Sequence, residues 1–436
     1  MTWKLFLSLA LALVCLAAQA ADTNIPLAQP VARSEFNVRD FGAKGDGLAK
    51  DTAALQKALD ACAVGGGTVV VPAGDYLTGS LVLGANTTLR LETRANLTGS
   101  ADIADYPLVR VRWEGEFAQG HRALLSAENA DHLTITGAGT ITGPPSDLSR
   151  LRNPRGPALI EIAGAKNVLL ENFSTHYQGL WSLHLLFCQN FTARNLTIRS
   201  ANVNGDGMDV DSCSDVLIEH CDINAGDDAI SLKSGRSQAA ANLARPTQDV
   251  IIRDCTLTSS QFAAVGIGSE MSGGIRRVRL ENCTLAGHQN GIFFKSRDGR
   301  GGFIEDVTGE NLIVNHSPTF VAINLLNKGI QASDPVRGDV DQWALLQNIT
   351  FKNIRVNDVA QLIAAANIPP QKPARNLSFA NLTGTCGKGI TLANVVDANL
   401  SAINVTGFQG PLLTKQNVTG TGLDNPAAPA KSANAR

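Results

Sequence analysis

The segment Asn167-Val-Leu-Leu-Glu-Asn-Phe173 decides the fold, because close variants of it recur along the rest of the chain. The variants are Asn190-Phe-Thr-Ala-Arg-Asn-Leu196, Asp215-Val-Leu-Ile-Glu-His-Cys221, Asp249-Val-Ile-Ile-Arg-Asp-Cys255 and Arg277-Val-Arg-Leu-Glu-Asn-Cys283, with later copies at 348–354 and 376–382. The first five copies begin 23, 25, 34 and 28 residues apart, as a common unit with loop insertions would. Self-similarity at this period indicates a solenoid of stacked repeats.

Each copy alternates apolar and polar residues, which is typical of a β-strand, and no helix-length segment separates one copy from the next. Strands that stack in parallel without crossover helices predict an all-β fold, the right-handed parallel β-helix. The sixth position carries side chains that hydrogen-bond the backbone in turns, namely Asn172, Asn195, His220, Asp254 and Asn282. The seventh position should point into the core, and it carries Phe173, Leu196, Cys221, Cys255 and Cys283.

The cysteines of the seventh position are therefore predicted to be small buried hydrophobic residues rather than disulfide partners. The sequence leaves open a bridge between Cys221 and Cys255 or between Cys255 and Cys283. Seven cysteines follow residue 20, and an odd number leaves at least one thiol without a partner in the chain.

The two ends of the chain differ from the repeats. An apolar run at 5–18 closes on Ala18-Gln19-Ala20, which predicts a signal peptide over 1–20, cut after Ala20, and a secreted or periplasmic protein. A helix over 51–62, with Asp51 as its N-cap and glycines at 65–67 ending it, should cover the open first coil. A single β-helix domain is expected over 21–424, and the Pro, Ala, Lys and Ser residues of 425–436 predict a disordered tail.

The composition excludes several classes of protein. With 37 Lys and Arg against 39 Asp and Glu, the 436-residue chain has a net charge of -2, which argues against a nucleic-acid partner. The apolar run at 5–18 is shorter than the roughly 18 to 20 residues that span a bilayer, so we expect no membrane insertion. We also expect the protein to be a monomer.

Acidic residues concentrate in Asn204-Gly-Asp206-Gly-Met-Asp209-Val-Asp211 and in Gly226-Asp227-Asp228. Asp206 precedes Asp227 and Asp228 by 21 and 22 residues, about one coil, so adjacent coils should place the three carboxylates side by side. Strand alternation puts Lys233 and Lys295 on the same outer face as this cluster. The sequence therefore predicts an open groove, lined by carboxylates and lysines, that suits an extended polymer.

Three clustered carboxylates cannot all ionise easily, so at least one should keep its proton near neutral pH. Cleavage of an acetal needs this combination, because a carboxylic acid protonates the leaving oxygen while a carboxylate activates water, about 6.5 to 9.5 Å away if configuration inverts. Alternatively, the aspartates are only turn residues, or they bind calcium, although no EF-hand or zinc pattern is present. His184 is expected in the same region, where it either contacts substrate or is a satisfied structural residue.

Five motifs occur together in this chain. They are Phe36-Asn-Val-Arg-Asp-Phe-Gly-Ala-Lys-Gly-Asp-Gly47, the segments at 204–209 and 226–228, Ile267-Gly-Ser-Glu-Met-Ser-Gly-Gly274 and Gly291-Ile-Phe-Phe-Lys295. Together they resemble glycoside hydrolase family 28, the polygalacturonase family, over most of the chain. Segment 204–209 is similar to the family's Asn-Thr-Asp motif, and 226–228 is similar to its Gly-x-Asp-Asp motif.

The resemblance implies an inverting hydrolase of pectic or another acidic polysaccharide, in which Asp227 is the general acid and Asp206 and Asp228 activate the water. It also implies that Lys295 holds a uronate carboxylate beside the scissile bond. We expect no cofactor and no metal. The substrate-binding residues that we expect are Lys295, Asn204, Lys233, His184, Arg297 and Arg300.

The chain departs from the family pattern at several positions. Phe262 stands in place of the histidine of a Gly-His-Gly motif, Phe293 replaces the arginine of Arg-Ile-Lys, and no tyrosine follows residue 177. Loss of the arginine removes a bidentate carboxylate clamp. In one alternative, Arg297 and Arg300 supply the charge from a displaced position and the substrate remains a galacturonan with α-1,4 linkages. In the other, the two phenylalanines form an apolar patch for a deoxy sugar such as rhamnose, as in rhamnogalacturonan, or for a substituted uronide.

Two other functions stay open on the same scaffold. One is a calcium-dependent, pectate-lyase-like β-eliminase, and the other is a polysaccharide-binding β-helix without catalysis. The sequence also leaves endo and exo cleavage open. The insertion at 236–247 is a candidate wall across one end of the groove, as an exo enzyme requires.

Overall fold

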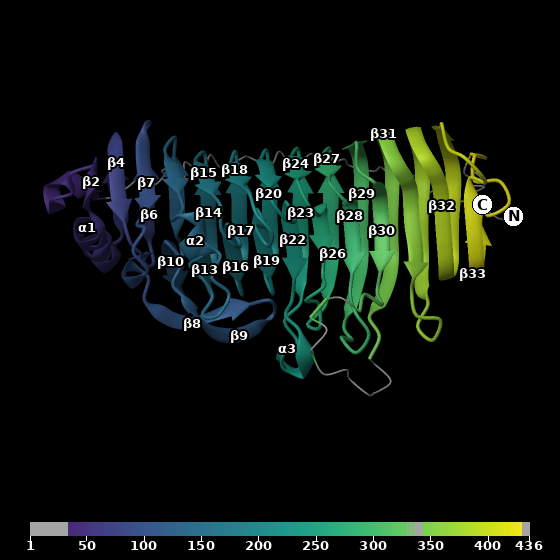
Figure 1. Ribbon diagram of the computed structural model, residues 1–436, viewed down its shortest axis with the longest axis horizontal. Helices are drawn as coiled ribbons and strands as arrows, with labels where there is room; N and C mark the ends of the chain where they lie inside the picture. The colour runs from purple at the N-terminus through teal and green to yellow at the C-terminus, as the bar shows by residue number, and fades with distance from the viewer. Residues whose placement is uncertain (1–33, 329, 332–333, 335–341, 430–436) are drawn as a thin grey trace, which may run out of the picture. The chain divides into compact units, whose positions relative to one another are not determined.

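The structure is a computed structural model that describes residues 34–328, 330, 331, 334 and 342–429. The expected signal peptide at 1–20 and residues 430–436 of the expected tail lie outside these residues. In the described part, 31 strands form one hydrogen-bonded array whose neighbouring coils pair in parallel, and they stack side by side along the horizontal direction of Figure 1. The predicted right-handed parallel β-helix is confirmed.

Each complete coil contributes one strand to each of three sheets. Sheet 1 contains β5 (Leu81–Val82), β10 (Leu125–Glu128), β13 (Ile160–Ala163), β16 (Leu183–Leu186), β19 (Met208–Asp211), β22 (Ile230–Lys233), β25 (Ala263–Ile267), β28 (Asn290–Lys295) and β30 (Thr319–Asn324). Sheet 2 contains β1 (Glu35–Asn37), β3 (Gly67–Val71), β6 (Thr87–Leu91), β11 (Thr134–Gly137), β14 (Lys166–Glu171), β17 (Gln189–Arg194), β20 (Ser214–Glu219), β23 (Thr247–Arg253) and β26 (Ile275–Glu281).

Sheet 3 contains β2 (Asp46–Lys50), β4 (Gly74–Thr78), β7 (Ala95–Gly99), β12 (Thr140–Thr142), β15 (Ser174–Tyr177), β18 (Thr197–Ser200), β21 (Asp222–Ala225), β24 (Thr256–Ser259) and β27 (Thr284–Gly287). Four longer strands complete the array, namely β29 (Phe303–Asn315), β31 (Leu345–Asn367), β32 (Ala374–Thr406) and β33 (Leu413–Thr421). Strand β29 continues from one sheet into the next, because it pairs with both β26 and β27.

The sixth position of the repeat makes the sharp turn between sheet 2 and sheet 3. All five of its residues have a left-handed backbone, with φ of 68° at Asn172, 53° at Asn195, 52° at His220, 54° at Asp254 and 55° at Asn282. Asn195 Nδ2 donates to Asn172 Oδ1 at 3.0 Å, so these side chains also join neighbouring coils. Asn and Asp tolerate this conformation better than most residues, which explains their recurrence in the sequence.

The seventh-position side chains are buried in the core, as predicted. All seven cysteines of the described residues are buried and none forms a disulfide, so the alternative of a Cys221–Cys255 or Cys255–Cys283 bridge is wrong. The Cys221 N–H instead donates to Cys255 Sγ at 3.4 Å. The thiols therefore stack in register as small core residues.

Helix α1 (Thr52–Gly65) covers the first coil with Leu55 and Leu59 on its buried side. Asp51 stands at its cap position, but the expected side-chain cap is absent. The Asp51 carboxylate instead accepts hydrogen bonds from the N–H groups of Lys44 and Gly45 at 2.7 and 2.9 Å, because the preceding loop supplies nearer donors.

At the other end of the described chain, residues 425–429 bond back to β32. The Ala402 and Ile403 N–H groups donate to the carbonyls of Ala428 and Pro426 at 2.7 and 3.0 Å. These five residues, which belong to the tail expected from the sequence, therefore contact the last coils.

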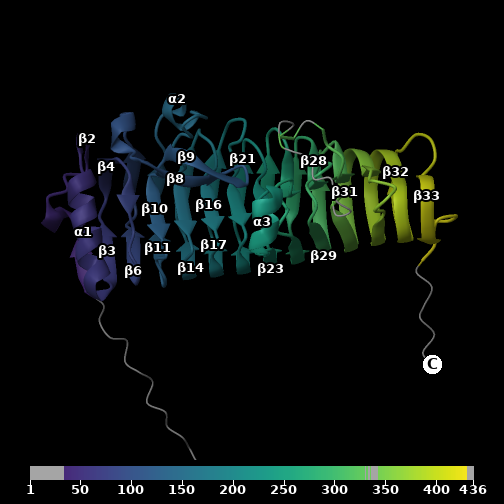
Figure 2. The ribbon, with the colours of Figure 1, turned by 90° about the horizontal axis from the view of Figure 1, so that it is seen from below.

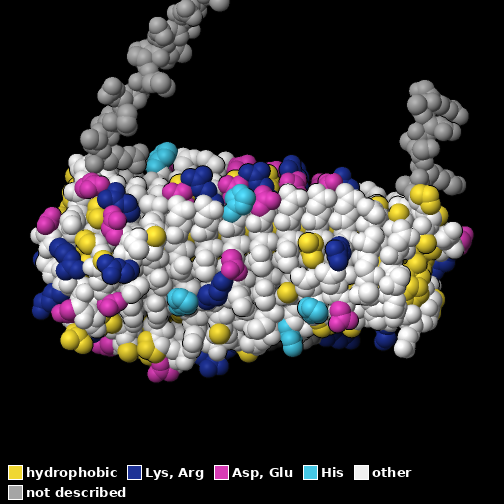
Figure 3. All heavy atoms as spheres, turned by 90° about the horizontal axis from the view of Figure 1, so that it is seen from above, with side chains coloured by type: hydrophobic (Ala, Val, Ile, Leu, Met, Phe, Trp, Pro, Cys, Tyr) yellow, Lys and Arg dark blue, Asp and Glu magenta, His cyan; other side chains and the backbone are white. Residues whose placement is uncertain are grey.

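Segments outside the repeat gather along one side of sheet 1. Strands β8 (Leu108–Trp113) and β9 (Glu116–His121) form an antiparallel hairpin, which crosses β10, β13 and β16 in Figure 2. Helices α2 (Ser146–Ser149) and α3 (Ser237–Leu243) lie in other connections. On the opposite side, seen in Figure 3, mostly backbone and uncharged polar side chains cover the middle of the surface.

Candidate active site

Three aspartates meet where sheet 3 connects to sheet 1. Asp206 lies between β18 and β19, and Asp227 and Asp228 lie one coil later, between β21 and β22. One oxygen of each carboxylate lies within 4.8 Å of the other two. The loops are joined because the Gly207 N–H donates to the Asp228 carbonyl at 3.0 Å. The one-coil spacing in the sequence thus brings these carboxylates side by side, as expected.

Asp228 has the largest set of donors. Lys295 Nζ lies 2.5 Å from its Oδ2, the Ala263 N–H donates to Oδ1 at 3.2 Å, and Ser231 Oγ donates to Oδ2 at 3.3 Å. Gly266 makes this position possible, because a Cβ on it would lie 2.1 Å from Asp228 Oδ2. The side chain of Asp228 is therefore held in place by three donors.

Asp227 differs from its neighbours because it forms no ion pair with any described residue. Its carboxylate accepts hydrogen bonds from the N–H groups of Asn204 at 3.0 Å and Asp228 at 2.9 Å. Burial, together with the charges of Asp206 and Asp228, raises the pKa of Asp227 to about 8. Asp227 is therefore a carboxyl group that can hold a proton near neutral pH without a neighbouring cation.

A buried lysine lies on the other side of Asp206. Lys233 Nζ is 3.5 Å from Asp206 Oδ2, 2.9 Å from Asp209 Oδ1 and 3.8 Å from Glu270 Oε2. It also lies 4.0 Å from the ring centroid of Trp181. Burial lowers the pKa of Lys233, but the three carboxylates outweigh burial and hold that pKa well above its usual value.

The carboxylates around Lys233 respond differently to burial. Burial and the nearby charge of Asp209 raise the pKa of Asp206 well above its usual range, and burial raises the pKa of Asp209 to about 7. Burial also acts on Glu270, but Lys233, Arg300 and Lys295 overcome it and hold the Glu270 pKa at about 2. The cluster therefore contains both protonated and ionised carboxyl groups at neutral pH.

The three aspartates open into a cavity of about 390 Å³. Its lining consists of Glu114, Trp181, Asn204, Asp206, Asp227, Asp228, Lys233, Phe262, Ser269, Glu270, Gln289, Phe293, Lys295, Asn324, Asn327, Ile330 and Gln331. Glu114 comes from the tip of the β8–β9 hairpin, so this hairpin supplies one wall. The Gly115 carbonyl accepts a hydrogen bond from the Arg236 N–H at 3.3 Å, which joins the tip to the insertion at 236–247.

The predicted open groove needs a correction at these coils. Asp209 and Asp211 occupy outward positions, as strand alternation predicts, yet both are 0% exposed, and Lys233 is 5% exposed. Asp211 accepts a bond from Arg112 Nε of the hairpin at 3.1 Å, which shows what covers it. The outer face here is a partly open cavity rather than an open groove, because segments outside the repeat lie over part of sheet 1.

Three of the expected substrate-binding residues do not line the cavity. His184 is fully buried, with Nδ1 3.2 Å from Glu161 Oε2 and its ring packed against Trp181. Arg297 bonds to the carbonyls of Ile330 and Gln331, and Arg300 bonds to the Ser269 carbonyl at 2.7 Å and to Asp334 Oδ2 at 3.2 Å. These arginines hold the segment that forms the cavity wall.

The other expected residues, Asn204, Lys233 and Lys295, do line the cavity, as do Phe262 and Phe293. Lys295 Nζ lies 5.7 Å from the Phe293 ring centroid, so a single ammonium stands beside an aromatic face. The side chains of Arg297 and Arg300 bind protein groups instead of facing the cavity. The hypothesis that they replace the missing arginine of the family motif is therefore not supported.

Sequence reasoning missed several cavity residues. Glu270, which lines the cavity, stands inside the quoted motif at 267–274 and so had a detectable signal. Asp209, which lies behind the cavity as a partner of Lys233, stands inside the motif at 204–209. Trp181 lies three residues before His184 but carried no repeat signal. Glu114 belongs to a hairpin outside the repeats, and no pattern in the sequence points to it.

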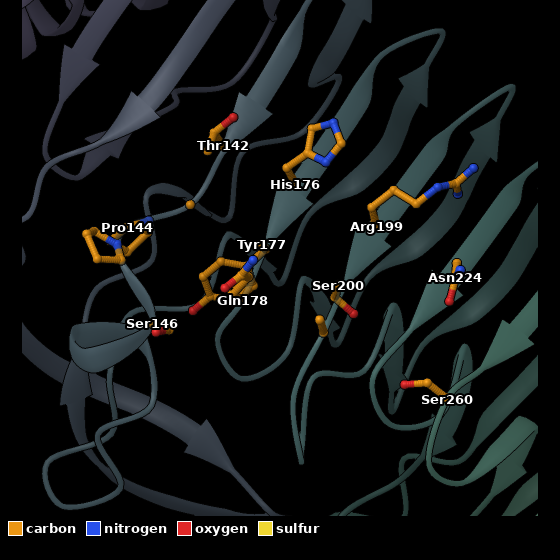
Figure 4. Close-up of a pocket in the computed structure, with 13 residues that line it drawn as sticks. Thr142, Pro144, Ser146, His176, Tyr177, Gln178, Arg199, Ser200, Asn224 and Ser260 are labelled. Carbon is orange, nitrogen blue, oxygen red and sulfur yellow. The ribbon is translucent and has the colours of Figure 1, made fainter. Parts of the chain in front are cut away.

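A second cavity, of about 470 Å³, lies on the sheet 3 side of the same coils (Figure 4). Thr142, His176, Arg199 and Asn224 stand in a row on adjacent strands there, because they are register partners. Arg199 is paired with Asp222 at 2.5 Å, and the lining contains no Asp or Glu. This cavity lacks the carboxyl pair that acetal cleavage requires.

The three aspartates could offer oxygen ligands to a cation. The ammonium of Lys295 already lies 2.5 Å from Asp228, and that of Lys233 lies 3.5 Å from Asp206. A divalent cation at this point would be repelled by two positive charges. The donor set therefore does not fit calcium well.

Comparisons with known proteins agree with the geometry. The profile of glycosyl hydrolases family 28 matches residues 63–402. A probable polygalacturonase of Vitis vinifera is 30% identical over 362 residues, covering 79% of this chain and 73% of that protein. An exo-poly-alpha-D-galacturonosidase of Dickeya chrysanthemi is 24% identical over 380 residues, covering 74% and 62%.

Solved structures share the fold. A family 28 exopolygalacturonase of Yersinia enterocolitica superposes with a TM-score of 0.79 at 21% identity, covering 89% of this chain and 78% of that one. An exopolygalacturonase of Thermotoga maritima gives a TM-score of 0.71 at 24% identity, covering 89% and 92%. The chain belongs to glycosyl hydrolases family 28 and is a glycoside hydrolase. Among the described helices, none has the length and apolar character to cross a bilayer.

Proposed function

We propose that the protein hydrolyses glycosidic bonds of a pectic polysaccharide, with Asp227 as the general acid and Asp206 and Asp228 as the groups that activate water. The observation that carries this proposal is the set of three carboxylates within 4.8 Å, each with different partners. The names polygalacturonase and exo-poly-alpha-D-galacturonosidase among the relatives support a galacturonan as substrate.

We infer the role of each carboxyl group from the groups that it contacts. Asp227 has no ion pair, so it keeps a proton and transfers it to the glycosidic oxygen as the C1–O bond breaks. Lys295 Nζ lies 2.5 Å from Asp228 and Lys233 Nζ lies 3.5 Å from Asp206, and the charge of Lys233 opposes the burial that raises the pKa of Asp206. One of them accepts a proton from the water whose oxygen bonds to C1, so the enzyme ends the step with Asp227 ionised and the base protonated.

The stereochemical course that we propose is inversion, which the family resemblance implies. The 4.8 Å limit on the oxygen separations is shorter than the about 6.5 to 9.5 Å usual for inverting enzymes, so this spacing does not support inversion by itself. Support comes from Asp228, whose three donors leave it poorly suited to bond to C1 as a nucleophile. NMR of the first-formed anomer decides, and a retained anomer would contradict inversion.

Lys295 and the two phenylalanines define the sugar that we propose. Lys295 Nζ, with its side chain 13% exposed, is the cation for a uronate carboxylate next to the scissile bond. Phe262 and Phe293 supply apolar surface for the face of a sugar ring. We therefore propose that a galacturonate unit lies against Lys295. A comparison of polygalacturonate with rhamnogalacturonan as substrates identifies the sugar unit on the other side of the scissile bond.

We also propose that cleavage starts from a chain end. Glu114 at the hairpin tip lies 3.6 Å from Arg152, and both the tip and Gln331 stand at the cavity, so walls limit how far a polymer can extend. Two structural neighbours named exopolygalacturonases support the same mode. Early release of only short products from long polygalacturonate is expected, whereas a rapid fall in polymer length would contradict it.

The decisive experiment compares the parent protein with Asp227→Asn on polygalacturonate and rhamnogalacturonan, following reducing ends and ultraviolet absorbance. We expect reducing ends without absorbance, and a loss of about 10²- to 10⁴-fold in kcat for Asp227→Asn. The matched control is Asp215→Asn, the same change at an exposed aspartate of β20. An absorbing, chelator-sensitive product would instead identify a β-eliminase, and binding without turnover by the parent would identify a binding protein.

Export is a further part of the proposal. The apolar run at 5–18 and the Ala18-Gln19-Ala20 sequence support a signal peptide, with secretion or delivery to the periplasm. Sequencing the N-terminus of the exported protein should give Ala21 as the first residue, and an intact N-terminus would contradict this.

A further inference from the structure

The β8–β9 hairpin carries arginines interleaved with aromatic rings away from the catalytic cavity. The Cζ atoms of Arg110 and Arg112 lie 4.0 and 5.2 Å from the centroid of the Phe117 ring. The Cζ atoms of Arg112 and Arg245 lie 5.7 and 4.7 Å from the centroid of Phe187. The two rings are 6.5 Å apart, so five side chains from three parts of the chain form one stack.

A cavity of about 410 Å³ lies beside this stack, between the hairpin and sheet 1. Its lining includes Arg110, Arg112, Arg122, Phe117, Phe187 and the outward residues of β10 and β13. Figure 2 shows the hairpin crossing these strands. The volume falls in the range of about 300 to 1,000 Å³ that is usual for ligand sites.

The charges of this cavity are not balanced. Arg110 and Arg122 have no ion pair with any described residue, whereas Arg112 is paired with Asp211. The acidic lining residues are Glu128 and Glu161, and Glu161 is already paired with Arg155 at 3.0 Å. Two guanidinium groups therefore face one free carboxylate, which favours an anionic ligand.

This cavity is separate from the catalytic one, because the two share no lining residue. The hairpin joins them: its tip supplies Glu114 to the catalytic cavity, and its strands supply Arg110 and Phe117 to the second. A ligand in the second cavity would consequently contact the same hairpin as the catalytic cavity without touching the three aspartates.

We propose that this cavity is a second, non-catalytic binding site for an anionic uronide segment, an inference that rests on the pectic substrate proposed above. The guanidinium groups of Arg110 and Arg122 bind sugar carboxylates, and exposed aromatic rings such as Phe117 pack against sugar C–H faces. Holding the polymer here raises its effective concentration at the catalytic cavity. Since the two cavities share no lining residue, we expect the site to act on long chains rather than on a dimer.

The test uses the full-length mature enzyme and the variant Arg110→Ala/Arg122→Ala, with Arg110→Gln/Arg122→Gln as a second version. We expect KM for polygalacturonate to rise about tenfold, since contacts to charged groups are lost, while kcat/KM for digalacturonate is unchanged. The matched control is Lys57→Ala/Arg375→Ala, which removes two exposed charges elsewhere. Its KM for polygalacturonate should equal that of the parent.

Affinity electrophoresis separates failure of this inference from failure of the proposed function. In gels containing polygalacturonate, Asp227→Asn should be retarded, and adding the two arginine substitutions should reduce the retardation about tenfold in apparent affinity. A neutral polysaccharide gel should retard neither protein. Equal retardation and equal KM for the arginine variants would overturn the second site, whereas absence of hydrolysis by the parent would overturn only the catalytic proposal.

Discussion

Lys295 Nζ lies 2.5 Å from Asp228 Oδ2, while the adjacent Asp227 forms no ion pair with any described residue. Two neighbouring carboxyl groups on one loop thus experience opposite environments. Burial and the neighbouring carboxylates raise the pKa of Asp227, whereas Asp228 has the ammonium group of Lys295 as a direct partner. This asymmetry leads to predictions about pH, charge and shape.

The alkaline limb of kcat/KM should reflect Asp227. The pKa of this carboxyl is raised to about 8, so activity should fall as pH rises through about 8, when the acid loses its proton. The measurement is kcat/KM on polygalacturonate from pH 4 to 10. Activity that stays constant up to pH 10 would assign the acid role to another group.

The same group should make stability depend on pH. The ordinary pKa of an aspartate is 3.8, so between pH 4 and 8 folded Asp227 binds a proton that the unfolded chain lacks. The free energy of unfolding therefore falls as pH rises through this interval. Asp227→Asn cannot ionise, so its Tm relative to the parent should increase from pH 5 to pH 8. A constant difference in Tm would contradict the raised pKa.

Replacing Lys233 should change the acid limb of activity. Lys233→Met removes the cation that Asp206, Asp209 and Glu270 share, so the pKa of Asp206 should rise and the acid limb should move to higher pH. Loss of one partner from a buried charge cluster should also cost about 3 to 5 kcal/mol of stability. Lys233→Arg, which keeps the charge, is the control. A raised KM with an unmoved acid limb would instead make Lys233 a substrate-binding residue.

Gly266 should be intolerant of a side chain for a reason specific to Asp228. A methyl group at this position would lie 2.1 Å from Asp228 Oδ2 and displace it from Lys295. Gly266→Ala should lose about 10²-fold in kcat, since displacement of a catalytic group by about 1 Å has this effect. The far-ultraviolet circular dichroism should not change. Parent-like kcat would show that Asp228 can move without cost.

The fold and the carboxylate cluster were predictable because both depend on local, repeated signals. Asn172 and Asn195 mark turns by their own chemistry, and the one-coil separation of Asp206 and Asp227 places them side by side through strand stacking alone. In a repeat of this kind, residues that are one coil apart in the sequence become neighbours in space.

The walls of the cavity could not be predicted, because they come from segments that do not repeat. Strand alternation correctly placed Asp211 outward, but no pattern shows that Arg112 of the β8–β9 hairpin covers it. For the same reason Arg297 and Arg300 appeared available for substrate, although they hold the wall near Gln331. Asp51 failed as a cap because nearby N–H groups of the loop compete for its carboxylate.

The stacked thiols of the core should limit how far the protein refolds after it has been unfolded by heat. Cys221, Cys255 and Cys283 are protected only while the coils remain stacked, because every described cysteine is buried and unpaired. Once the chain unfolds in air, these thiols can oxidise into non-native crosslinks faster than the long β-array reassembles. The lifetime of the folded protein in air should then be governed by its unfolding rate, and a reducing agent should make thermal unfolding reversible again.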